Sequence, residues 1–333
     1  MPPGTDLRLG ILGVSHGHPY SMSAFCNGYD REGLKEAYPN IVRYLEAQPP
    51  ENRRLSGARV VSIWAEDRRK AEHAAWIGRI PHVADRPEDL LDGVDGVLIT
   101  ENEGDTHLPL ARPFLERGIP IFFDRPLVSR WETMRQLWSE AGEDYPLMSC
   151  SNLRYNPALR EFKAEPGPVG TARLFRGLSA MDWFGYGWHM GETLVQLWGR
   201  EPVSVAFLGE SGPLKTVPWR DGAGNRHQVQ GGDWSVEVIW SKRRRALLQV
   251  LHPLAKMLEM SLHGTGGHLV LPADDPFFMM RSLLGDFTSM VRTGKRPVEL
   301  MKDTVAVCRI MIGADISRRA EGRRVRVENE LKL

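Results

Sequence analysis

The chain has 333 residues, of which 42% are hydrophobic and 26% are charged, and its formal net charge at pH 7 is +1. This length favours two domains of ordinary size, each with its own hydrophobic core. A charge balance so close to zero offers no electrostatic reason to bind nucleic acid or a lipid surface. We therefore expect a soluble globular protein with no nucleic-acid or membrane partner.

The cysteines and the first residues of the sequence indicate the cellular compartment of the protein. Cys26, Cys150 and Cys308 lack the spacing of a metal site, and their odd number favours reduced thiols. The opening MPPGTD does not resemble a secretory signal, and no apolar run has the length of a membrane span. Together these features predict a cytoplasmic protein.

The first part of the chain alternates apolar runs with amphipathic segments. Helical spacing is found over residues 66–77 and 107–118, the second ending at Gly118. The alternation predicts a parallel sheet covered by helices in a first domain over residues 1–148. Residues 24–55 are longer than a crossover requires and indicate an inserted helix and loop near the mouth of the sheet. The expected strands are residues 7–12, 58–64, 96–100, 120–123 and 146–150.

The second part of the chain, residues 149–333, changes character. Short strand-like runs separated by turns predict an open, largely antiparallel sheet. The basic run at residues 242–246 lies between two of these runs and indicates a solvated hairpin turn rather than a binding patch. Residues 277–322 return to helical spacing with a Gly-Lys-Arg-Pro break. The expected strands are residues 171–181, 202–209, 233–240, 245–252, 256–264 and 268–272.

Four sequence features occur in an order that suggests a family. An apolar run leads into Gly13, and TENEGDTHLPLARPFLERGIPIFFDRPL carries His107 and the tripeptide Asp124-Arg125-Pro126. GYGWHMGETLVQLWG carries His189, and the chain closes with RTGKRPVELMKDTVAVCRIMIGADISRRAEGRRVRV. Over nearly its whole length the chain resembles the Gfo/Idh/MocA oxidoreductases.

The resemblance implies an α/β fold with two domains. The N-terminal one is a Rossmann domain with a doubly wound parallel sheet that binds NAD or NADP. The C-terminal one is an α+β domain whose large, open, mostly antiparallel sheet often builds the oligomer interface, so a homodimer or homotetramer is expected. The implied reaction is hydride transfer on a sugar or polyol, with a carbohydrate-like small molecule as substrate.

The glycine turn departs from the dinucleotide fingerprint GxGxxG. Gly13 is kept, but Ser15 and His18 stand where further glycines are expected. Gly13 retains the tight turn and the Ser15 hydroxyl can donate to a phosphate, so we expect a modified cofactor site with Gly13, Ser15 and His16 as contacts. On an extended loop His16 and His18 would point to opposite sides with no carboxylate near them, so we expect no metal.

The end of the second expected strand carries the residues that would select the cofactor. Ala65 takes the place of the usual acidic residue, so Glu66 would serve the ribose hydroxyls of NAD, or Arg68 or Arg69 the 2′-phosphate of NADP. Solvated charges that cap the next helix are the alternative. The other positions assigned to the cofactor by resemblance are Thr100, Asn102, His107, Asp124 and Arg125.

Arg125 replaces the lysine that supports proton transfer in the family. A guanidinium stays protonated, so Arg125 can hold a substrate hydroxyl or stabilise an alkoxide but cannot act as a general base. Proton transfer then falls to His189, unless that residue is a structural histidine. The family's aspartate partner corresponds to Gly185; Asp182 or Tyr186 would replace it, unless Asp182 forms a turn. Glu192 is a further candidate to orient His189.

Two segments carry the candidate substrate residues. Arg154, Tyr155 and Asn156 either face the cleft or pin their helix to the sheet. The aromatic cluster over residues 183–188, with Trp188, either stacks on a sugar or belongs to the core.

These residues leave three functional hypotheses. The first is an NAD(P)-dependent dehydrogenase of a hydroxylated small molecule. The second is a ligand-binding protein of the same fold that has lost turnover, favoured by Ala65, Arg125 and Gly185. The third is an enzyme that reduces and reoxidises a bound cofactor within one cycle of elimination or glycoside cleavage. The fold alone does not separate them.

Overall fold

The computed structural model describes residues 5–165, 167–209, 215–220, 226–231, 233–241, 243–251, 258–273 and 275–333. The chain forms two compact units. The first comprises Met1–Cys150 and Pro276–Met301, and the second Ser151–Asp275 and Lys302–Leu333. The predicted boundary at residue 148 lies within two residues of the observed one. The return of residues 276–301 to the first unit was not predicted.

The first unit contains a six-stranded parallel sheet in the order β3-β2-β1-β4-β5-β6. Because the strand order reverses between β1 and β4, the carboxyl ends of these two strands border the position where such sheets bind ligands. The parallel sheet and its five expected strands are confirmed, and the short β3 was not predicted. The strands are β1 (Leu7–Leu12), β2 (Ala58–Trp64), β3 (His82–Val83), β4 (Gly96–Ile99), β5 (Ile121–Phe123) and β6 (Leu147–Ser149).

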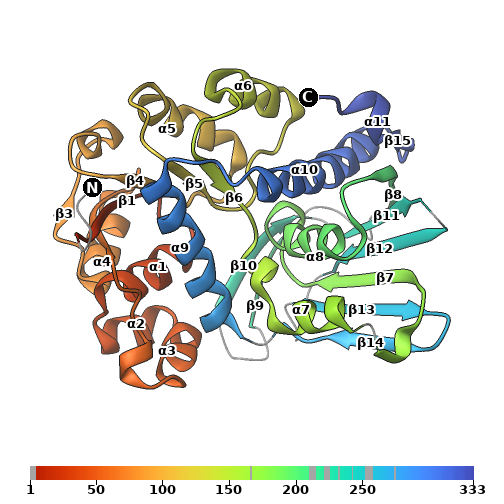
Figure 1. The fold of residues 1–333 in the computed structure, drawn as a ribbon, viewed down its shortest axis with the longest axis horizontal. Helices are drawn as coiled ribbons and strands as arrows, with labels where there is room; N and C mark the ends of the chain where they lie inside the picture. Colours follow the sequence, from red (N-terminus) through yellow and green to blue (C-terminus); the bar gives the residue numbers. More distant parts are fainter. Residues whose placement is uncertain are drawn as a thin grey trace. The chain divides into compact units, whose positions relative to one another are not determined.

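Several α-helices of the described chain lie around this sheet in the first unit, as Figure 1 shows. The inserted segment forms two helices, α2 and α3, rather than the single helix expected. The ring of Tyr38 between them lies over Gly17, where a Cβ would be 3.1 Å from Tyr38 Cε1, so the insert reaches the start of α1. The helices are α1 (His18–Asn27), α2 (Arg31–Ala37), α3 (Pro39–Glu46), α4 (Arg68–Gly78), α5 (Gly104–Glu116), α6 (Trp131–Ala141) and α9 (Pro276–Thr293).

Helix α9 packs on the sheet of the first unit although it follows the second unit's strands in sequence. The rings of Phe287 and Phe122 have centroids 6.0 Å apart, and those of Phe277 and Phe25 are 5.1 Å apart. A Cβ on Gly96 would lie 2.8 Å from Val291, so this glycine permits the close approach of helix and strand. Helical periodicity predicts an apolar face but not the sheet that covers it, which explains the missed assignment.

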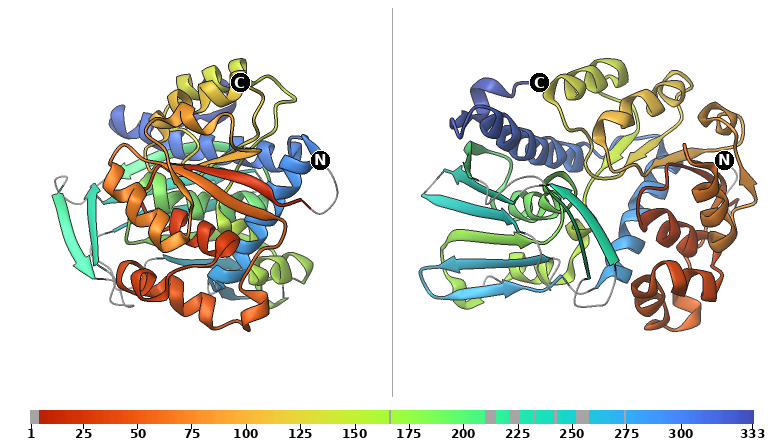
Figure 2. Two further views of the ribbon diagram at one scale, coloured as in Figure 1. Left: turned by 90° about the vertical axis from the view of Figure 1, so that its left-hand side faces the viewer. Right: turned by 180° about the vertical axis from the view of Figure 1, so that it is seen from behind.

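The second unit contains a seven-stranded sheet in the order β14-β13-β7-β12-β11-β8-β15, drawn as one layer in Figure 2. The β7–β12 pair is parallel and the other pairs in this sheet are antiparallel. The prediction of a largely antiparallel sheet is thus confirmed, and the parallel pair was not predicted. A separate antiparallel pair is formed by β9 (Lys215–Arg220) and β10 (Arg226–Gly231). The sheet strands are β7 (Ala172–Ser179), β8 (Pro202–Gly209), β11 (Trp234–Trp240), β12 (Arg244–Val250), β13 (Leu258–Gly264), β14 (His268–Leu271) and β15 (Val325–Arg326).

Helices cover one face of this sheet. A Cβ on Gly177 of β7 would lie 2.5 Å from Met190 of α8 (Trp188–Trp198), and Gly313 of α10 (Val298–Arg319) approaches Val205 of β8. Alternate residues of β11 are buried and half-buried, so one face of this strand is more accessible than the other. The remaining helices of this unit include α7 (Pro157–Ala164), α11 (Val327–Glu330) and the single π-turn η5 (Trp183–Gly187) before α8.

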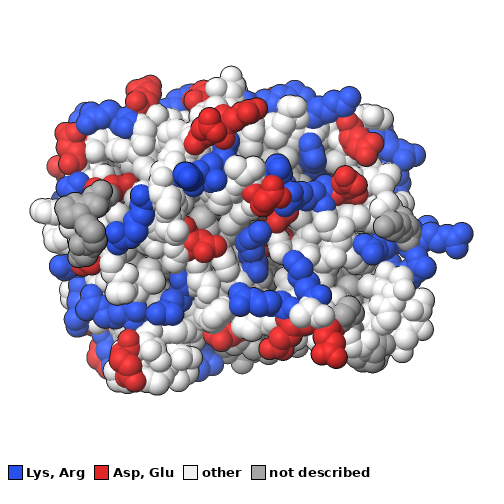
Figure 3. Space-filling view, viewed as in Figure 1, with Lys and Arg blue, Asp and Glu red and all other residues white. Residues whose placement is uncertain are grey.

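Three smaller expectations concern the surface and the thiols. Strands β11 and β12 form the predicted hairpin, with Arg243 exposed at its turn and Lys242 outside the described residues. Lys and Arg side chains intersperse with Asp and Glu over the face in Figure 3. The three cysteines are free and buried. Among the described helices, none has the length and apolar character needed to cross a bilayer.

Candidate functional site

The turn after β1 has the geometry of an anion-binding turn. Gly13 has φ +97°, a conformation that favours glycine, and the Thr100 hydroxyl donates to the Gly13 carbonyl over 2.7 Å. Helix α1 begins directly after it, with Gly17 as an N-cap that has no side chain to satisfy the first backbone N–H groups. The end of β1 therefore fits a phosphate, and fully buried Thr100 holds the turn from behind rather than facing a ligand.

A carboxylate that sequence reasoning missed lies on this turn. The Ser15 hydroxyl donates to Glu101 Oε2, and a Cβ on Gly13 would collide with the same side chain. Glu101 directly follows Thr100 after β4. The signal that would have found it is its place at the carboxyl edge of the sheet, where parallel strands bring their following residues together.

His16 and His18 converge on Asp124, which follows β5. Asp124 Oδ2 lies 2.5 Å from His18 Nδ1 and 3.3 Å from His16 Nε2, and Asp124 Oδ1 accepts from the Arg125 N–H over 2.8 Å. The expectation that the two histidines point to opposite sides, with no carboxylate near, is wrong. The chain is not extended here but already turns into the helical region at Gly17 (φ −76°, ψ −12°), which places the two rings 4.5 Å apart.

Burial and mutual charge set the protonation of this cluster. Burial acts to raise the pKa of Asp124, but the charge of His18 and the polar contacts of both imidazoles outweigh it and hold the pKa well below its usual value. Burial, followed by the charge of His18, lowers the pKa of His16 to about 4. At neutral pH Asp124 is therefore ionised and His16 neutral.

The side chains of His16, His18 and Asp124 are also of the types that bind metal ions. Their donor atoms lie within 4.8 Å of one another, close enough to hold a divalent cation. However, His16 Nδ1 accepts from the His18 backbone N–H over 3.0 Å, so neutral His16 carries its proton on Nε2, the nitrogen that faces Asp124. A metal ligand needs that nitrogen bare and the other one protonated. The contact between His18 and Asp124 is a hydrogen bond, whereas His16 Nε2, 3.3 Å from Asp124 Oδ2, has poor geometry for one.

The candidate ribose-binding residues at the end of β2 differ in the partners they have. Asp67 accepts from Arg69 N over 3.0 Å and caps α4, so the helix-capping alternative holds for this residue. Arg68 pairs with Glu72 over 2.8 Å and also with Asp85. Glu66 is exposed and makes no hydrogen bond or ion pair with the rest of the described chain. It is thus the acidic side chain available at this strand end.

The remaining residues expected at the cofactor differ in exposure. Asn102 is exposed, whereas Arg125 is buried. His107 is fully buried, with Nδ1 3.1 Å from the Leu127 carbonyl and Nε2 3.0 Å from the Glu101 carbonyl, and burial lowers its pKa. A side chain with no exposed surface does not reach a ligand. His107 therefore positions the loop that carries Glu101, which corrects its assignment as a cofactor contact.

In the second unit, Ser151 links the candidate base to a buried carboxylate. His189, near the start of α8, has Nδ1 2.6 Å from Ser151 Oγ, and the Ser151 N–H donates to Glu192 Oε2 over 3.3 Å. Tyr186 presents its ring to His189 edge-on, with centroids 5.2 Å apart. Burial raises the pKa of Glu192 although Arg154 acts in the opposite direction. Sequence reasoning missed Ser151, whose only local signal is its place before a helical turn.

Two expected site residues in this unit have other roles. The Asp182 carboxylate accepts from the Gly185 N–H and caps η5, so the turn-forming alternative describes it. Trp188 is fully buried, and its assignment to substrate is wrong because no surface is left for a ligand. Trp183 stacks on Trp234 in the core, with centroids 5.0 Å apart. Burial in the core therefore accounts for both tryptophans of this cluster.

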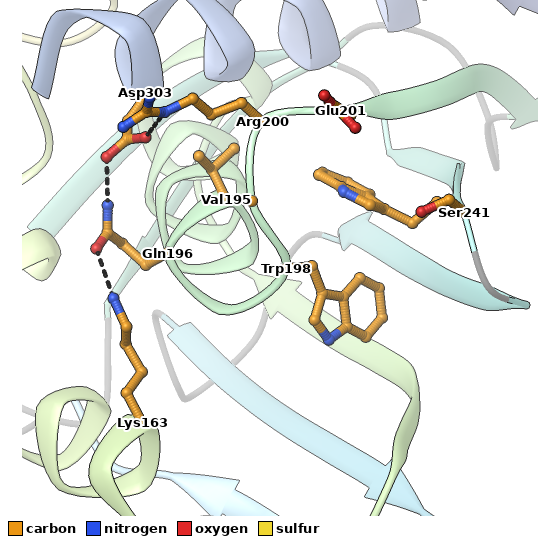
Figure 4. Close-up of a pocket in the computed structure, with 10 residues that line it drawn as sticks. Lys163, Val195, Gln196, Trp198, Arg200, Glu201, Ser241 and Asp303 are labelled. Atoms are coloured by element: carbon orange, nitrogen blue, oxygen red, sulfur yellow. Dashed lines mark hydrogen bonds and ion pairs between the residues drawn. The ribbon is translucent and has the colours of Figure 1, made fainter. Parts of the chain in front are cut away.

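Arg154 belongs to an ion-pair network rather than facing the solvent. Its Nη1 lies 3.1 Å from Glu192 Oε1 and 2.9 Å from Asp303 Oδ2. Asp303 also accepts from Gln196 and Arg200 beside a cavity of about 470 Å³ (Figure 4). Two carboxylates thus occupy Arg154, against its assignment to substrate. Tyr155 is half-buried, and Asn156 caps α7 through Ala158 N, so it pins that helix.

Comparison with known proteins was made for sequence and for fold. Residues 42–148 match the family described as "Oxidoreductase family, NAD-binding Rossmann fold". An inositol 2-dehydrogenase of Corynebacterium glutamicum is 32% identical over 133 residues, which are 38% of this chain and 39% of that protein. The aligned part of this chain thus spans about two fifths of that curated relative's length.

Solved structures extend the likeness to nearly the whole chain. Apo scyllo-inositol dehydrogenase from Lactobacillus casei has a TM-score of 0.68 at 14% identity, covering 98% of this chain and 99% of that one. Myo-inositol dehydrogenase from the same organism, in complex with NAD(H) and myo-inositol, has a TM-score of 0.66 at 15% identity and covers 97% of each chain. At these identities the likeness shows the fold. Residues 42–148 thus match the Gfo/Idh/MocA oxidoreductase family, and the likeness in fold extends over nearly the whole chain.

Proposed function

We propose that the protein is an NAD(P)-dependent oxidoreductase that transfers a hydride between a nicotinamide cofactor and a sugar, polyol or related hydroxylated molecule. The observation that carries the proposal is the Gly13 turn followed by an uncapped α1 at the point where the strand order reverses. The names of the similar proteins support a cyclic polyol such as inositol as the first substrate to test.

Separate residues would carry the different parts of the proposed reaction. When bound, the cofactor accepts or supplies the hydride. In the first unit, the backbone at Gly13 and Ser15 would hold the pyrophosphate and Glu66 the ribose hydroxyls. The Arg125 guanidinium would stabilise a developing alkoxide. In the second unit, the Ser151 hydroxyl can accept from His189 Nδ1–H, which leaves His189 Nε2 as the proton acceptor.

The proposal is tested by calorimetric titration of the purified protein with NAD(H) and NADP(H), after its absorbance has been checked for copurified nicotinamide. Micromolar binding of either cofactor upholds it and justifies a polyol screen. Absence of binding at millimolar concentration overturns the proposal and favours a ligand-binding protein without turnover. The Glu101 carboxylate on the glycine turn supports this alternative. Copurified cofactor without net turnover points to internal redox chemistry.

The setting of the enzyme is part of the proposal. We place it in the cytoplasm, since its three cysteines are free and buried. We expect a homodimer or homotetramer that uses the open face of the second unit's sheet. Light scattering coupled to size exclusion measures the assembly, and a monomer at micromolar concentration would contradict this part.

Glu66→Ala is expected to weaken NAD binding at least tenfold and to leave NADP binding within threefold. The physical reason is the loss of a carboxylate that accepts from both ribose hydroxyls, whereas Arg68 is already held by Glu72 and Asp85. Calorimetry with both cofactors gives the answer. Arg69→Ala is the matched control. If the wild type prefers NADP and the Arg69→Ala variant loses this preference, Arg69 rather than Glu66 selects the cofactor.

Ser151→Ala is expected to lower kcat about tenfold with KM within twofold. Ser151 is fully buried, and the change removes the hydroxyl that holds His189 Nδ1 and also accepts from Leu153 N over 3.0 Å. Steady-state kinetics measure the effect, with Ser261→Ala on β13 as the control. Because Ser151→Thr keeps the hydroxyl, it should restore kcat. Equal losses in the alanine and threonine variants would make Ser151 a packing residue.

A further inference from the structure

The glycine turn carries a feature that the proposed function does not use, the Glu101 carboxylate held by the Ser15 hydroxyl. We propose that Glu101 is a carboxylate latch on the cofactor site, and that a pyrophosphate enters only when this side chain leaves Ser15. The inference rests on the proposed function and adds to it an element that sets cofactor affinity.

The latch occupies the space that a glycine turn normally keeps open. Gly13 lacks a Cβ, and a Cβ built there would collide with the Glu101 carboxylate. The glycine thus makes room for a side chain of the same protein. In a dinucleotide site the backbone approaches the pyrophosphate at the second fingerprint position, which is Ser15 here, and the Glu101 carboxylate accepts from the Ser15 hydroxyl. Glu101 and a pyrophosphate therefore compete for one position.

The backbone under Glu101 is fixed from both sides. The preceding residue, Thr100, donates its hydroxyl to the Gly13 carbonyl over 2.7 Å, and His107 Nε2 lies 3.0 Å from the Glu101 carbonyl. Both anchoring side chains are fully buried. Because the main chain is held, opening requires rotation of the Glu101 side chain rather than movement of the loop. Ser15 is exposed and Glu101 half-buried, so the side chain has room to turn toward solvent.

Charge explains both why the latch closes and what opens it. The start of α1 has no side-chain cap, and its N–H groups favour a negative charge. The Glu101 carboxylate, held at Ser15 on the turn that leads into this helix, serves as an internal stand-in for phosphate. The Ser15 hydroxyl can donate to either anion, so binding exchanges one acceptor for another. If the carboxylate stayed, it would repel the incoming charges at contact distance, a cost of about tenfold or more in affinity.

The latch also explains why Ser15 stands at a position where the fingerprint has glycine. A glycine there would leave Glu101 without a hydrogen-bond donor from this residue. The serine keeps the closed state ordered, and it remains a donor for phosphate in the open state. Ser15 and Glu101 thus form one device, although 86 residues separate them in the chain.

The test compares Kd values for NAD, NADH and ADP among the wild type, Glu101→Gln and Glu101→Ala. ADP carries the pyrophosphate without the nicotinamide and isolates the latch. We expect both variants to bind at least tenfold more tightly than the wild type. Glu103→Gln, the same change at an exposed residue two positions away, is the matched control and should stay within twofold. Thermal unfolding of every variant checks that the fold is kept.

The outcomes separate the latch from the proposed function. Binding by the variants but not by the wild type upholds the latch in its strongest form. Equal binding by wild type and both variants overturns the latch and leaves the proposed function standing. Weaker binding by the variants overturns it as well, because Glu101 would then be a ligand of the cofactor. Absence of binding in wild type and variants alike overturns the latch together with the proposed function.

Discussion

His189→Ala is expected to lower kcat at least a hundredfold while the Kd for NAD changes by less than threefold. A positioned general base contributes roughly 10²- to 10⁴-fold, and a methyl group in its place has no proton acceptor. The groups proposed to hold the cofactor belong to the first unit, whereas His189 belongs to the second. Steady-state kinetics with the best substrate from the polyol screen, and calorimetry with NAD, measure the two quantities.

The control for this variant is His263→Ala, which removes a half-buried histidine from β13 of the same unit. It should leave kcat within twofold. Added imidazole should partly restore the activity of the His189 variant, because a free base can enter the vacated space. Parallel losses of kcat and NAD affinity would instead identify His189 as a structural histidine.

The free energy of unfolding is expected to fall by about 3 kcal/mol as the pH is lowered from about 6.5 to about 4, through His16 alone. The pKa of His16 is lowered to about 4 in the folded state, because the side chain is buried and His18 adds a like charge. Between the two pKa values the unfolded chain binds a proton that the folded chain does not. Acid therefore favours unfolding across this window.

Urea unfolding at pH 7, 5.5 and 4.5 measures this loss. His16→Gln should flatten the profile, since glutamine does not titrate. His82→Gln, at an exposed histidine of β3, should leave the slope as in the wild type. Asp124 makes a separate contribution to the free energy of unfolding. Because its pKa is lowered in the folded state, this stabilisation is present above about pH 4 and is lost only at lower pH. A flat wild-type profile above pH 4.5 would refute the role of His16.

Local pattern was enough to predict most of the strands of both sheets. Alternating and continuous apolar runs predicted the five longer parallel strands and the antiparallel character of the second sheet, because period and flanking turns are encoded within a few residues. The order of the motifs also suggested the family whose model matches residues 42–148. The return of α9 to the first unit was not predicted, since an apolar helix face is compatible with either sheet.

The details of the site depended on distant pairs. His18 meets Asp124 across 106 residues, His189 meets Ser151 across 38, and Ser15 meets Glu101 across 86. None of these distances along the chain is a local period, so sequence reasoning assigned the histidines from loop geometry and missed both Ser151 and Glu101. Burial was equally hidden: Trp188 and His107 carry functional residue types, yet each is fully enclosed.

The late position of α9 has a consequence for how the protein is made. Residues 276–293 supply rings that cover Phe122 and Phe25, so the first unit's core lacks them until most of the chain has left the ribosome. During synthesis the apolar surface of the parallel sheet therefore stays exposed until the second unit's strands and then α9 have been translated. Such an intermediate is prone to aggregation, and a chaperone that shields apolar surface would raise the yield of folded protein more than slower translation would.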